Sequence, residues 1–592
     1  MIRFINLFIV CSFYLIAGEN DWLKAPQDVP KEYEPYIFAT PTQKQWFNDA
    51  KFGVFLHWGP AAIIKERLSW SRFGKRVGHR DADRGVPADV YDQLYKRFNP
   101  TEFNADKWIQ TFKDAGAKYI IFVTKHHDGF CMFDAKNTEY KITNTPFERD
   151  LCKEIAEACH KYGMRIFWYY SQPDWHHPDC LDEKNHGNYQ KYMFDQLRQL
   201  CTDYGKIDGI WFDGLKTHWT HWETPKLLKM LRTLQPGILI NSRAGRGLTV
   251  GDDKSVRYDF DNAELRFGKY EVNKSWEMCA TITETWAWSG GKNIKPFKTC
   301  IRMLIAATAA GGNLALNTGP TPQGTINSKE VEVLKQMGSW LEKYGESIYN
   351  TKGGPYMPDL WGASTRKGNK IFLHITQTFA TNTKAILTLK QPGLKIKNVS
   401  SLTGAKVKLI NETKKQFQLE LDHSSLNDVD NIIVLELVSD ASKLPSIPAQ
   451  KHKDLAHNQR ASASSVHVAK NSPQNVFGEA GHVVREGARH KLSWIASRKD
   501  KSPWIAVDLG KSMTFDTIQV HEQVRTVRTR DFSLQYKKEN EWITFFEGKD
   551  PGLDFTLKHN PIQAQHVRLK IIKSDWGHPN ISFFHIYNTE GR

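Results

Sequence analysis

Polar side chains that can hold or attack a small organic molecule recur at one place in the pattern of this 592-residue chain, directly after short apolar runs. Imidazole, phenol, carboxylate and guanidinium groups all occur there. The residues are His57, His126, His127, Tyr170, Asp213 and Arg243. Because the carboxyl ends of parallel strands gather at one side of a barrel, this repetition predicts a shared pocket.

Carboxylates suggest the chemistry of that pocket. Asp213 follows the run IDGIWF, and a carboxylate there can act as a nucleophile, a metal ligand or a helix N-cap. A glycosidase needs two carboxylates with different tasks. Glu264, Glu277 and Glu284 are the candidates for the second, and the pattern alone leaves all three open.

The histidines allow a metal hypothesis, which the rest of the pattern does not favour. His126 and His127 are adjacent, and His57 could supply a third zinc ligand. Carboxylates and aromatic residues suit a carbohydrate better, because imidazoles hydrogen-bond sugar hydroxyls and aromatic rings stack on apolar sugar faces. The run GGNLALNTGP (311–320) lacks the ending of a phosphate-binding loop. We expect no metal and no cofactor.

Alternating strand-like and helix-like stretches between about 50 and 320 would position these residues. Helical patterns cover 105–116 and 149–163. The alternation predicts a parallel sheet, and seven or more strands in this length favour a (β/α)8-like barrel. The predicted strands are 51–59, 118–127, 164–171, 207–214, 237–243, 276–282 and 312–319.

The second half of the chain has an all-β pattern. Short alternating apolar runs separated by Gly and Asn turns predict a small antiparallel β-sandwich, and a Ser/Pro/Lys-rich linker precedes further short strands. The predicted organisation is a signal peptide at 1–18, the catalytic barrel at 19–350, the β-sandwich at 351–440, the linker at 441–454 and a β jelly-roll at 455–592.

The N-terminal segment and the net charge of the chain indicate where the protein is located and which partners it binds. Arg3 precedes an apolar run that ends in Ala17 and Gly18, the layout of a secretory signal peptide. We expect an exported protein, extracellular, periplasmic or lumenal, without integral membrane insertion. Lys and Arg exceed Asp and Glu by 81 − 65 = +16, but the charges are dispersed. This favours a solvated basic surface, and no nucleic-acid partner is expected.

Several motifs together resemble the α-L-fucosidase family of glycoside hydrolases. The resemblance implies a (β/α)8-like barrel followed by a β-sandwich, and a metal-free mechanism that retains anomeric configuration. The matching pieces, in family order, are FLHWGP (55–60), FVTKHHDGF (122–130), YYSQPDW (169–175), DGIWFDG (208–214), NSR (241–243), YDFDNAEL (258–265), SWEMCATITETWAW (275–288) and GGNLALNTGP (311–320).

The resemblance also implies residue roles. Asp213 matches the nucleophile and Glu264 the general acid/base, with Glu277 as second choice. Ser69 stands where the family often has Glu, with Glu66 nearby. The implied substrate-binding residues are His57, Trp70, His126, His127, Tyr170, Trp211 and Arg243.

Residues 455–592 resemble a discoidin-like (coagulation-factor C-type) domain, through SWIASRKDKSPWIAVDLGK (493–511) and two later strands. Such domains often bind carbohydrate, although Trp494 and Trp504 fit a core better. The prediction is a retaining exo-glycosidase that removes terminal α-L-fucose from glycans or glycoconjugates. A catalytically inactive fucose-binding lectin and another exo-glycosidase, such as an α-galactosidase, are the alternatives.

Overall fold

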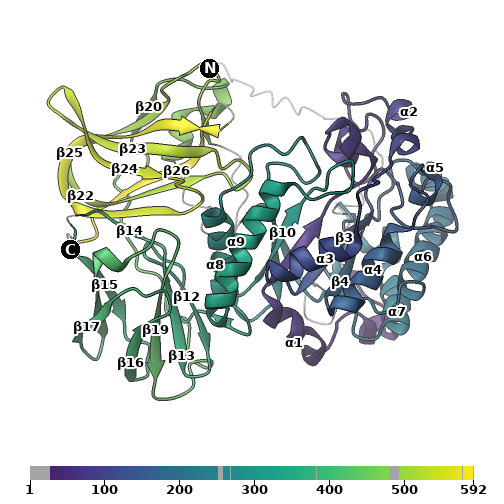
Figure 1. Ribbon diagram of the computed structural model, residues 1–592, viewed down its shortest axis with the longest axis horizontal. Helices are drawn as coiled ribbons and strands as arrows, with labels where there is room; N and C mark the ends of the chain where they lie inside the picture. The colour runs from purple at the N-terminus through teal and green to yellow at the C-terminus, as the bar shows by residue number, and fades with distance from the viewer. Residues whose placement is uncertain are drawn as a thin grey trace, which may run out of the picture.

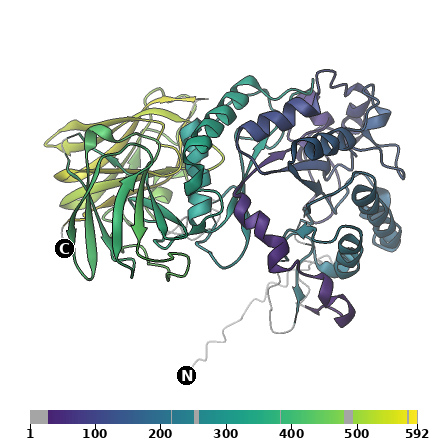
Figure 2. The same ribbon diagram turned by 60° about the horizontal axis from the view of Figure 1, so that its bottom comes forward.

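The computed structural model describes residues 27–215, 217–250, 258–266, 268–381, 383–478, 493–575 and 578–590. The predicted signal peptide lies outside these residues. Among the residues described, no helix is long and apolar enough to cross a membrane. Figure 1 and Figure 2 show the barrel on the right and two β domains on the left, with helices α8 and α9 between them.

The barrel is an eight-stranded parallel sheet in the described part of the chain, and its strands follow one another in chain order. Its two edges, β6 and β8, meet at a bridge between Asn241 and Phe260. All seven predicted strands are present, and β8 is the eighth. The strands are β2 (Phe52–Leu56), β3 (Tyr119–Lys125), β4 (Arg165–Tyr170), β5 (Gly209–Phe212), β6 (Leu239–Ile240), β8 (Asp261–Glu264), β9 (Trp276–Thr281) and β10 (Asn313–Thr318).

Helices follow most of these strands, as the sequence predicted. The connections after β6 and β8 contain no helix in their described residues. Local signals fix the ends of α4, because Asp150 caps its first turn and Gly163, with φ of 66°, ends it. The helices after strands are α3 (Ala105–Asp114), α4 (Leu151–Tyr162), α6 (His186–Thr202), α7 (Thr224–Leu234), α8 (Phe297–Ala309) and α9 (Ser328–Tyr344).

Shorter elements complete the barrel. Helix α1 (Pro41–Ala50) leads into β2, and Phe47 packs among the interior residues of the barrel. The remaining short elements are α2 (Ala88–Tyr91), α5 (Pro178–Leu181), β1 (Gln27–Asp28) and β7 (Leu248–Thr249).

Alternation along each strand decides which residues face the barrel interior. Tyr169 and Trp211 belong to the interior cluster of aromatic and aliphatic side chains. Their neighbours Trp168, Tyr170 and Phe212 pack in the layer between the sheet and the outer helices. Because successive side chains on a strand point to opposite faces, adjacent residues of one strand serve different layers.

The β-sandwich follows the barrel as predicted. The side chains of β15 are alternately buried and exposed, so that one face of its sheet covers the core. One sheet contains β11 (Lys352–Gly353), β12 (Gly362–Lys367), β13 (Lys370–Ile375), β19 (Asn431–Leu437) and β16 (Ile396–Ser401), and the other contains β15 (Ala385–Lys390), β18 (Gln416–Leu421) and β17 (Val407–Glu412).

The C-terminal domain is an antiparallel sheet consistent with the predicted jelly-roll. Trp494 is fully buried in its core, whereas Trp504 is half-buried. The strands are β20 (Arg460–Ala463), β21 (Trp494–Ile495), β22 (Trp504–Glu522), β23 (Thr529–Lys538), β24 (Glu541–Lys549), β25 (Phe555–Ser574) and β26 (Asn580–Tyr587).

The segment 441–454, predicted as a linker, makes fixed contacts. Arg366 donates to the carbonyl of Ala441, and the Ile447 N–H donates to the carbonyl of Pro355. The carboxylate of Asp454 lies 2.6 Å from Nδ1 of His585 in the C-terminal domain. In addition, the short strand β14 (Thr378–Phe379) of the sandwich region pairs with β25. The C-terminal domain is therefore docked on the rest of the protein.

Candidate active site

Asp213 lies at the centre of the pocket, directly after β5. Its Oδ2 accepts a hydrogen bond from the Tyr169 hydroxyl at 3.0 Å, and its Oδ1 accepts one from Arg243 Nη1 at 3.1 Å. The side chain is 13% exposed. Burial raises the pKa of Asp213 above its ordinary value, and the charge of Arg243 opposes this increase. The carboxylate is thus held in place yet reachable from the open end of the barrel.

Arg243 joins Asp213 to a second carboxylate. Its Nη2 donates to Glu264 Oε2 at 2.8 Å, and its guanidinium lies 4.8 Å from the ring centre of Trp211. Gly214 lets the backbone of Arg243 lie close to the end of β5, since a Cβ at Gly214 would lie 2.7 Å from the Arg243 carbonyl oxygen. Glu264 is the last residue of β8, and its side chain is 24% exposed. One guanidinium group therefore spans two partly exposed carboxylates at the barrel mouth.

His57 is fixed in one tautomer by Asn317 at the end of β10. The Asn317 amide donates its Nδ2 hydrogen to the carbonyl of Trp286 at 2.7 Å, so its Oδ1 faces His57 Nδ1 at 2.7 Å. The proton of the neutral ring is then on Nδ1, and Nε2 retains a lone pair. Burial lowers the pKa of His57 to about 4, so the ring is neutral at neutral pH.

His127 presents a second imidazole acceptor. The Ser171 hydroxyl donates to the carbonyl of Pro173 and therefore accepts from His127 Nδ1, at 2.5 Å. Burial lowers the pKa of His127, which leaves Nε2 with a lone pair. This buried atom has no hydrogen-bond partner among the described residues and lies 3.5 Å from Asp213 Oδ2. Nε2 of His127 is therefore a hydrogen-bond acceptor placed beside the Asp213 carboxylate.

His126 is held by Ser69. The Ser69 Oγ lies 2.6 Å from His126 Nδ1 and accepts the Asp128 N–H at 2.7 Å. Glu66 instead accepts a hydrogen bond from Ser71 at 2.9 Å. Ser69, and not Glu66, therefore positions His126 in the pocket.

Aromatic rings surround the polar groups. Trp211 stacks on Tyr169 at 5.5 Å between ring centres, and the ring of Trp70 lies 5.4 Å from that of His127. Trp286, in the loop after β9, lies 4.9 Å from the ring of His57. Such rings offer flat apolar surfaces for the apolar face of a sugar.

The structure corrects one predicted contact, Tyr170. Its hydroxyl donates to Gln196 on α6 at 2.7 Å, and its ring lies 4.5 Å from the Lys125 ammonium, outside the barrel interior. Since neighbours on β4 point to opposite faces, Tyr169 reaches the pocket in its place. The other predicted residues at the pocket are brought together: His57, Trp70, His126, His127, Trp211, Asp213, Arg243 and Glu264.

The two alternative glutamates have other surroundings. Glu277 is fully buried in the barrel interior and accepts hydrogen bonds from the Tyr119 hydroxyl and the Trp211 indole, at 2.6 and 3.1 Å. Burial raises the pKa of Glu277 to about 7. Glu284 pairs with Arg528 of the C-terminal domain at 2.6 Å.

Sequence reasoning missed Tyr169, Asn317 and Trp286. Asn317 closes a predicted strand inside the run GGNLALNTGP, a signal that could have identified it. The described residues contain no group of three or more His, Cys, Asp or Glu side chains placed to hold a metal ion.

Comparisons with known proteins identify the family of the chain. A family profile described as Alpha-L-fucosidase matches residues 23–346, and one described as F5/8 type C domain matches residues 460–583. Tissue alpha-L-fucosidase of Bos taurus is 30% identical over 331 residues, which cover 52% of this chain and 69% of that protein.

Solved structures give the same result. Alpha-L-fucosidase isoenzyme 1 from Paenibacillus thiaminolyticus superposes with a TM-score of 0.58 at 31% identity, covering 67% of this chain and 98% of that one. An alpha-L-fucosidase from Bacteroides thetaiotaomicron, solved as a trapped covalent intermediate, superposes with a TM-score of 0.60 at 25% identity, covering 69% and 100%. The protein described here belongs to the α-L-fucosidase family.

Proposed function

We propose that this protein is a retaining exo-glycosidase that hydrolyses terminal α-L-fucose from glycans or glycoconjugates. The observation that carries the proposal is the pair Asp213 and Glu264, joined by Arg243 at the mouth of the barrel. A retaining glycosidase needs its carboxylates only about 5 Å apart, and a pair bound to one guanidinium group suits this requirement. Family membership and the covalent intermediate trapped in the Bacteroides relative support the same mechanism.

In the first step, Asp213 attacks the anomeric carbon while Glu264 donates its proton to the departing glycosidic oxygen. The bond between the anomeric carbon and that oxygen breaks, and an ester forms between fucose and Asp213. In the second step, Glu264 takes a proton from water, the water oxygen attacks the anomeric carbon, and the ester bond breaks. Asp213 is released as a carboxylate, and fucose leaves with its configuration retained.

The groups around Asp213 have distinct tasks in this scheme. Arg243 supplies a positive charge that lowers the pKa of Asp213 and so opposes the effect of burial. Tyr169 fixes the orientation of the carboxylate through its hydroxyl. The lone pairs on Nε2 of His57 and His127 can accept hydrogen bonds from sugar hydroxyls. The aromatic rings cover the apolar surface of the sugar.

The test is hydrolysis of an aryl α-L-fucoside and an aryl α-D-galactoside by the wild type and by Asp213→Asn. We expect fucoside cleavage by the wild type, little galactoside cleavage and almost no cleavage by the variant. Release that does not exceed the Asp213→Asn level would identify a lectin. Faster cleavage of the galactoside would identify an α-galactosidase.

We further infer that residues 1–18 direct export and that the C-terminal domain binds glycan. The apolar leader and the discoidin-type profile support these two statements. N-terminal sequencing of protein recovered from the culture medium tests the first, and should begin near Glu19. Binding of the Asp213→Asn protein to a glycan array, in the presence of excess fucose, tests the second.

A further inference from the structure

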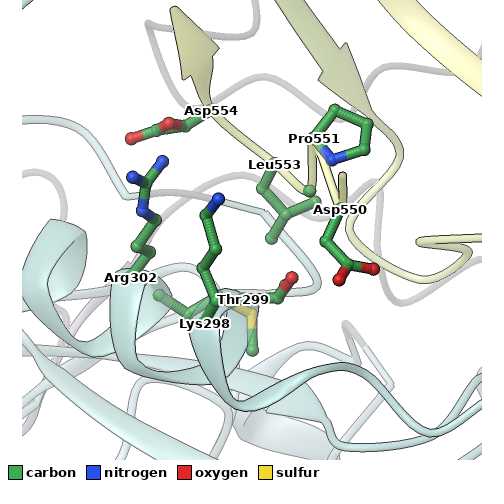
Figure 3. A pocket seen from close by; sticks show the side chains of 9 residues that line it. Lys298, Thr299, Arg302, Asp550, Pro551, Leu553 and Asp554 are labelled. Carbon is green, nitrogen blue, oxygen red and sulfur yellow. The ribbon is translucent and has the colours of Figure 1, made fainter. Parts of the chain in front are cut away.

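Apolar side chains dock the C-terminal domain onto the barrel. Val524, Val527 and Leu553 belong to the C-terminal domain, yet they are buried among the core residues of the barrel. Figure 3 shows a second part of this contact, where loop 550–554 faces Lys298, Thr299 and Arg302 of α8 across a pocket of about 10 Å³. A pocket of this size holds about one water molecule. The contact is a closely packed interface.

Polar groups connect the same interface to the loop after β9. Arg528 and Glu284 form a two-pronged ion pair, with Nε–Oε1 and Nη2–Oε2 distances of 2.6 and 2.9 Å. Their side chains are only 15% and 20% exposed. Nearby, the buried ammonium of Lys295 donates to the carbonyls of Thr281 and Thr283, at 2.7 and 2.8 Å, and to that of Arg525 in the C-terminal domain at 3.4 Å.

The loop that receives these contacts, residues 281–289, is held together from within. Thr281, Thr283 and Thr285 each donate a hydroxyl hydrogen to the carbonyl two residues further along. Such local hydrogen bonds from hydroxyl groups offer the backbone an alternative to the hydrogen bonds of a helix or a sheet. They fix the path of this loop. A displacement at Glu284 should therefore move the whole loop.

The same loop ends in the catalytic pocket. The carbonyl of Trp286 accepts the amide hydrogen of Asn317, whose oxygen fixes His57. The Trp286 ring lies 4.9 Å from the His57 ring and is half-buried. A continuous set of contacts thus runs from Arg528 to a histidine and a tryptophan of the pocket.

We propose that Arg528 is a positioning residue for catalysis and that the C-terminal domain is a structural part of the fucose pocket. The ion pair with Glu284 holds loop 281–289, and the loop holds Trp286 and His57 in the geometry that receives the sugar. This inference rests on the proposed fucosidase function. A small misplacement of groups that bind the substrate costs about one to two orders of magnitude in rate.

The test compares Arg528→Ala, Glu284→Ala and the exchanged pair Glu284→Arg with Arg528→Glu in the full-length protein. Arg568→Ala is the control, because Arg568 contacts Gln535 and Trp542 within the C-terminal domain. We expect both single variants to lose about tenfold in kcat/KM for an aryl fucoside, mainly through a higher KM. The exchanged pair should recover a large part of this loss, and the control should retain wild-type kinetics.

Wild-type kinetics in a folded Arg528→Ala protein would overturn the proposal, as would an exchanged pair no better than the single variants. If a single variant fails to fold, Arg528→Lys replaces it, and an unchanged KM then contradicts the proposal. Calorimetric measurement of the affinity for L-fucose distinguishes failure of this proposal from failure of the proposed fucosidase function, because it does not depend on hydrolysis. In a protein without hydrolytic activity, Arg528→Ala should still weaken fucose binding about tenfold.

Discussion

Two glutamates on neighbouring strands, Glu264 at the barrel mouth and Glu277 inside the barrel, have opposite surroundings. In the parallel pairing of β8 and β9, Glu264 is level with Cys279 and therefore lies two residues beyond Glu277 along the barrel. At about 3.3 Å per residue, this difference is about 7 Å. Glu264 is partly exposed beside a cation, whereas Glu277 is buried and hydrogen-bonded by aromatic residues.

This comparison shows that the position of a carboxylate along the barrel axis decides whether it can take part in the reaction or only support the pocket. A carboxylate at the mouth can exchange a proton with substrate and water. The buried Glu277 carboxyl holds the Trp211 indole, and that ring packs against Tyr169 and Arg243. We therefore expect substitutions at the mouth to change chemistry and substitutions in the interior to change stability.

The largest effect is expected for Asp213→Gly, because this change removes the nucleophile. Turnover of an aryl fucoside should fall by about four orders of magnitude or more. Azide should restore activity and give the fucosyl azide of inverted configuration, identified by NMR. Asp208→Asn is the matched control, since Asp208 lies before the same strand and pairs with Arg165 at 2.6 Å. Near-wild-type turnover in Asp213→Gly would rule out the assignment.

A smaller and substrate-dependent loss is expected for Glu264→Ala. General acid catalysis contributes about 10² to 10⁴ in rate, and a good leaving group needs it least. Natural fucosylated oligosaccharides should therefore lose far more kcat/KM than a dinitrophenyl fucoside. Azide should here give the product of retained configuration. The same pattern in Glu277→Ala, with Glu264→Ala little affected, would reverse the two assignments.

The pair Tyr169→Phe and Tyr170→Phe tests the two faces of one strand. Loss of a hydrogen bond to a charged group costs about 1.5–3 kcal/mol, so Tyr169→Phe should lower kcat about tenfold or more. Tyr170→Phe should leave kcat unchanged and lower the free energy of unfolding by about 1 kcal/mol. Kinetics and denaturant unfolding of both variants provide the measurement. Equal kinetic effects would contradict the strand geometry.

A small effect on activity, within about threefold of wild type, is expected for Glu277→Gln, because this buried residue supports the pocket and does not take part in the reaction. Its effect on stability should depend on pH. Burial raises the pKa of Glu277 from 4.5 to about 7, so the folded state keeps a proton that the unfolded chain releases above pH 4.5. Wild-type stability should therefore fall, relative to the variant, as pH rises from about 4.5 to about 7.

The loss of wild-type stability relative to Glu277→Gln should reach about 3 kcal/mol and stay constant above about pH 7. Denaturant unfolding of both proteins at pH 5 and pH 8 measures it. Parallel pH profiles would show that Glu277 does not titrate in this range. A thousandfold loss of activity in Glu277→Gln would place this residue in the reaction.

The fold could be predicted from sequence because alternation of strands and helices is a local pattern. The residues at strand ends followed from the same pattern, since parallel strands carry their carboxyl ends to one face. Glu277 is the second residue of β9, and its place near the amino end of the predicted strand 276–282 could have excluded it from the barrel mouth. Strand β8 was not predicted, because its residues, Asp-Asn-Ala-Glu, have low strand propensity.

Other features could not be predicted, for physical reasons. The run RIFWYY of β4 is apolar on both faces, so no alternation indicated whether Tyr169 or Tyr170 points inward. The pairing of Arg528 with Glu284 joins residues 244 positions apart, and no local pattern encodes such a contact. Trp286 reaches the pocket from an irregular loop, whose path depends on Asn317 and on the Thr hydroxyls.

The short strand β14 has a practical consequence for handling the C-terminal domain alone. Thr378 and Phe379 pair with Leu557 and Lys558 and so cover part of the edge of β25. A protein cut at residue 455 loses this cover and exposes unpaired backbone groups beside an apolar residue. Uncovered strand edges pair readily with other chains. The isolated domain should therefore aggregate through this edge, in a way that the intact protein avoids.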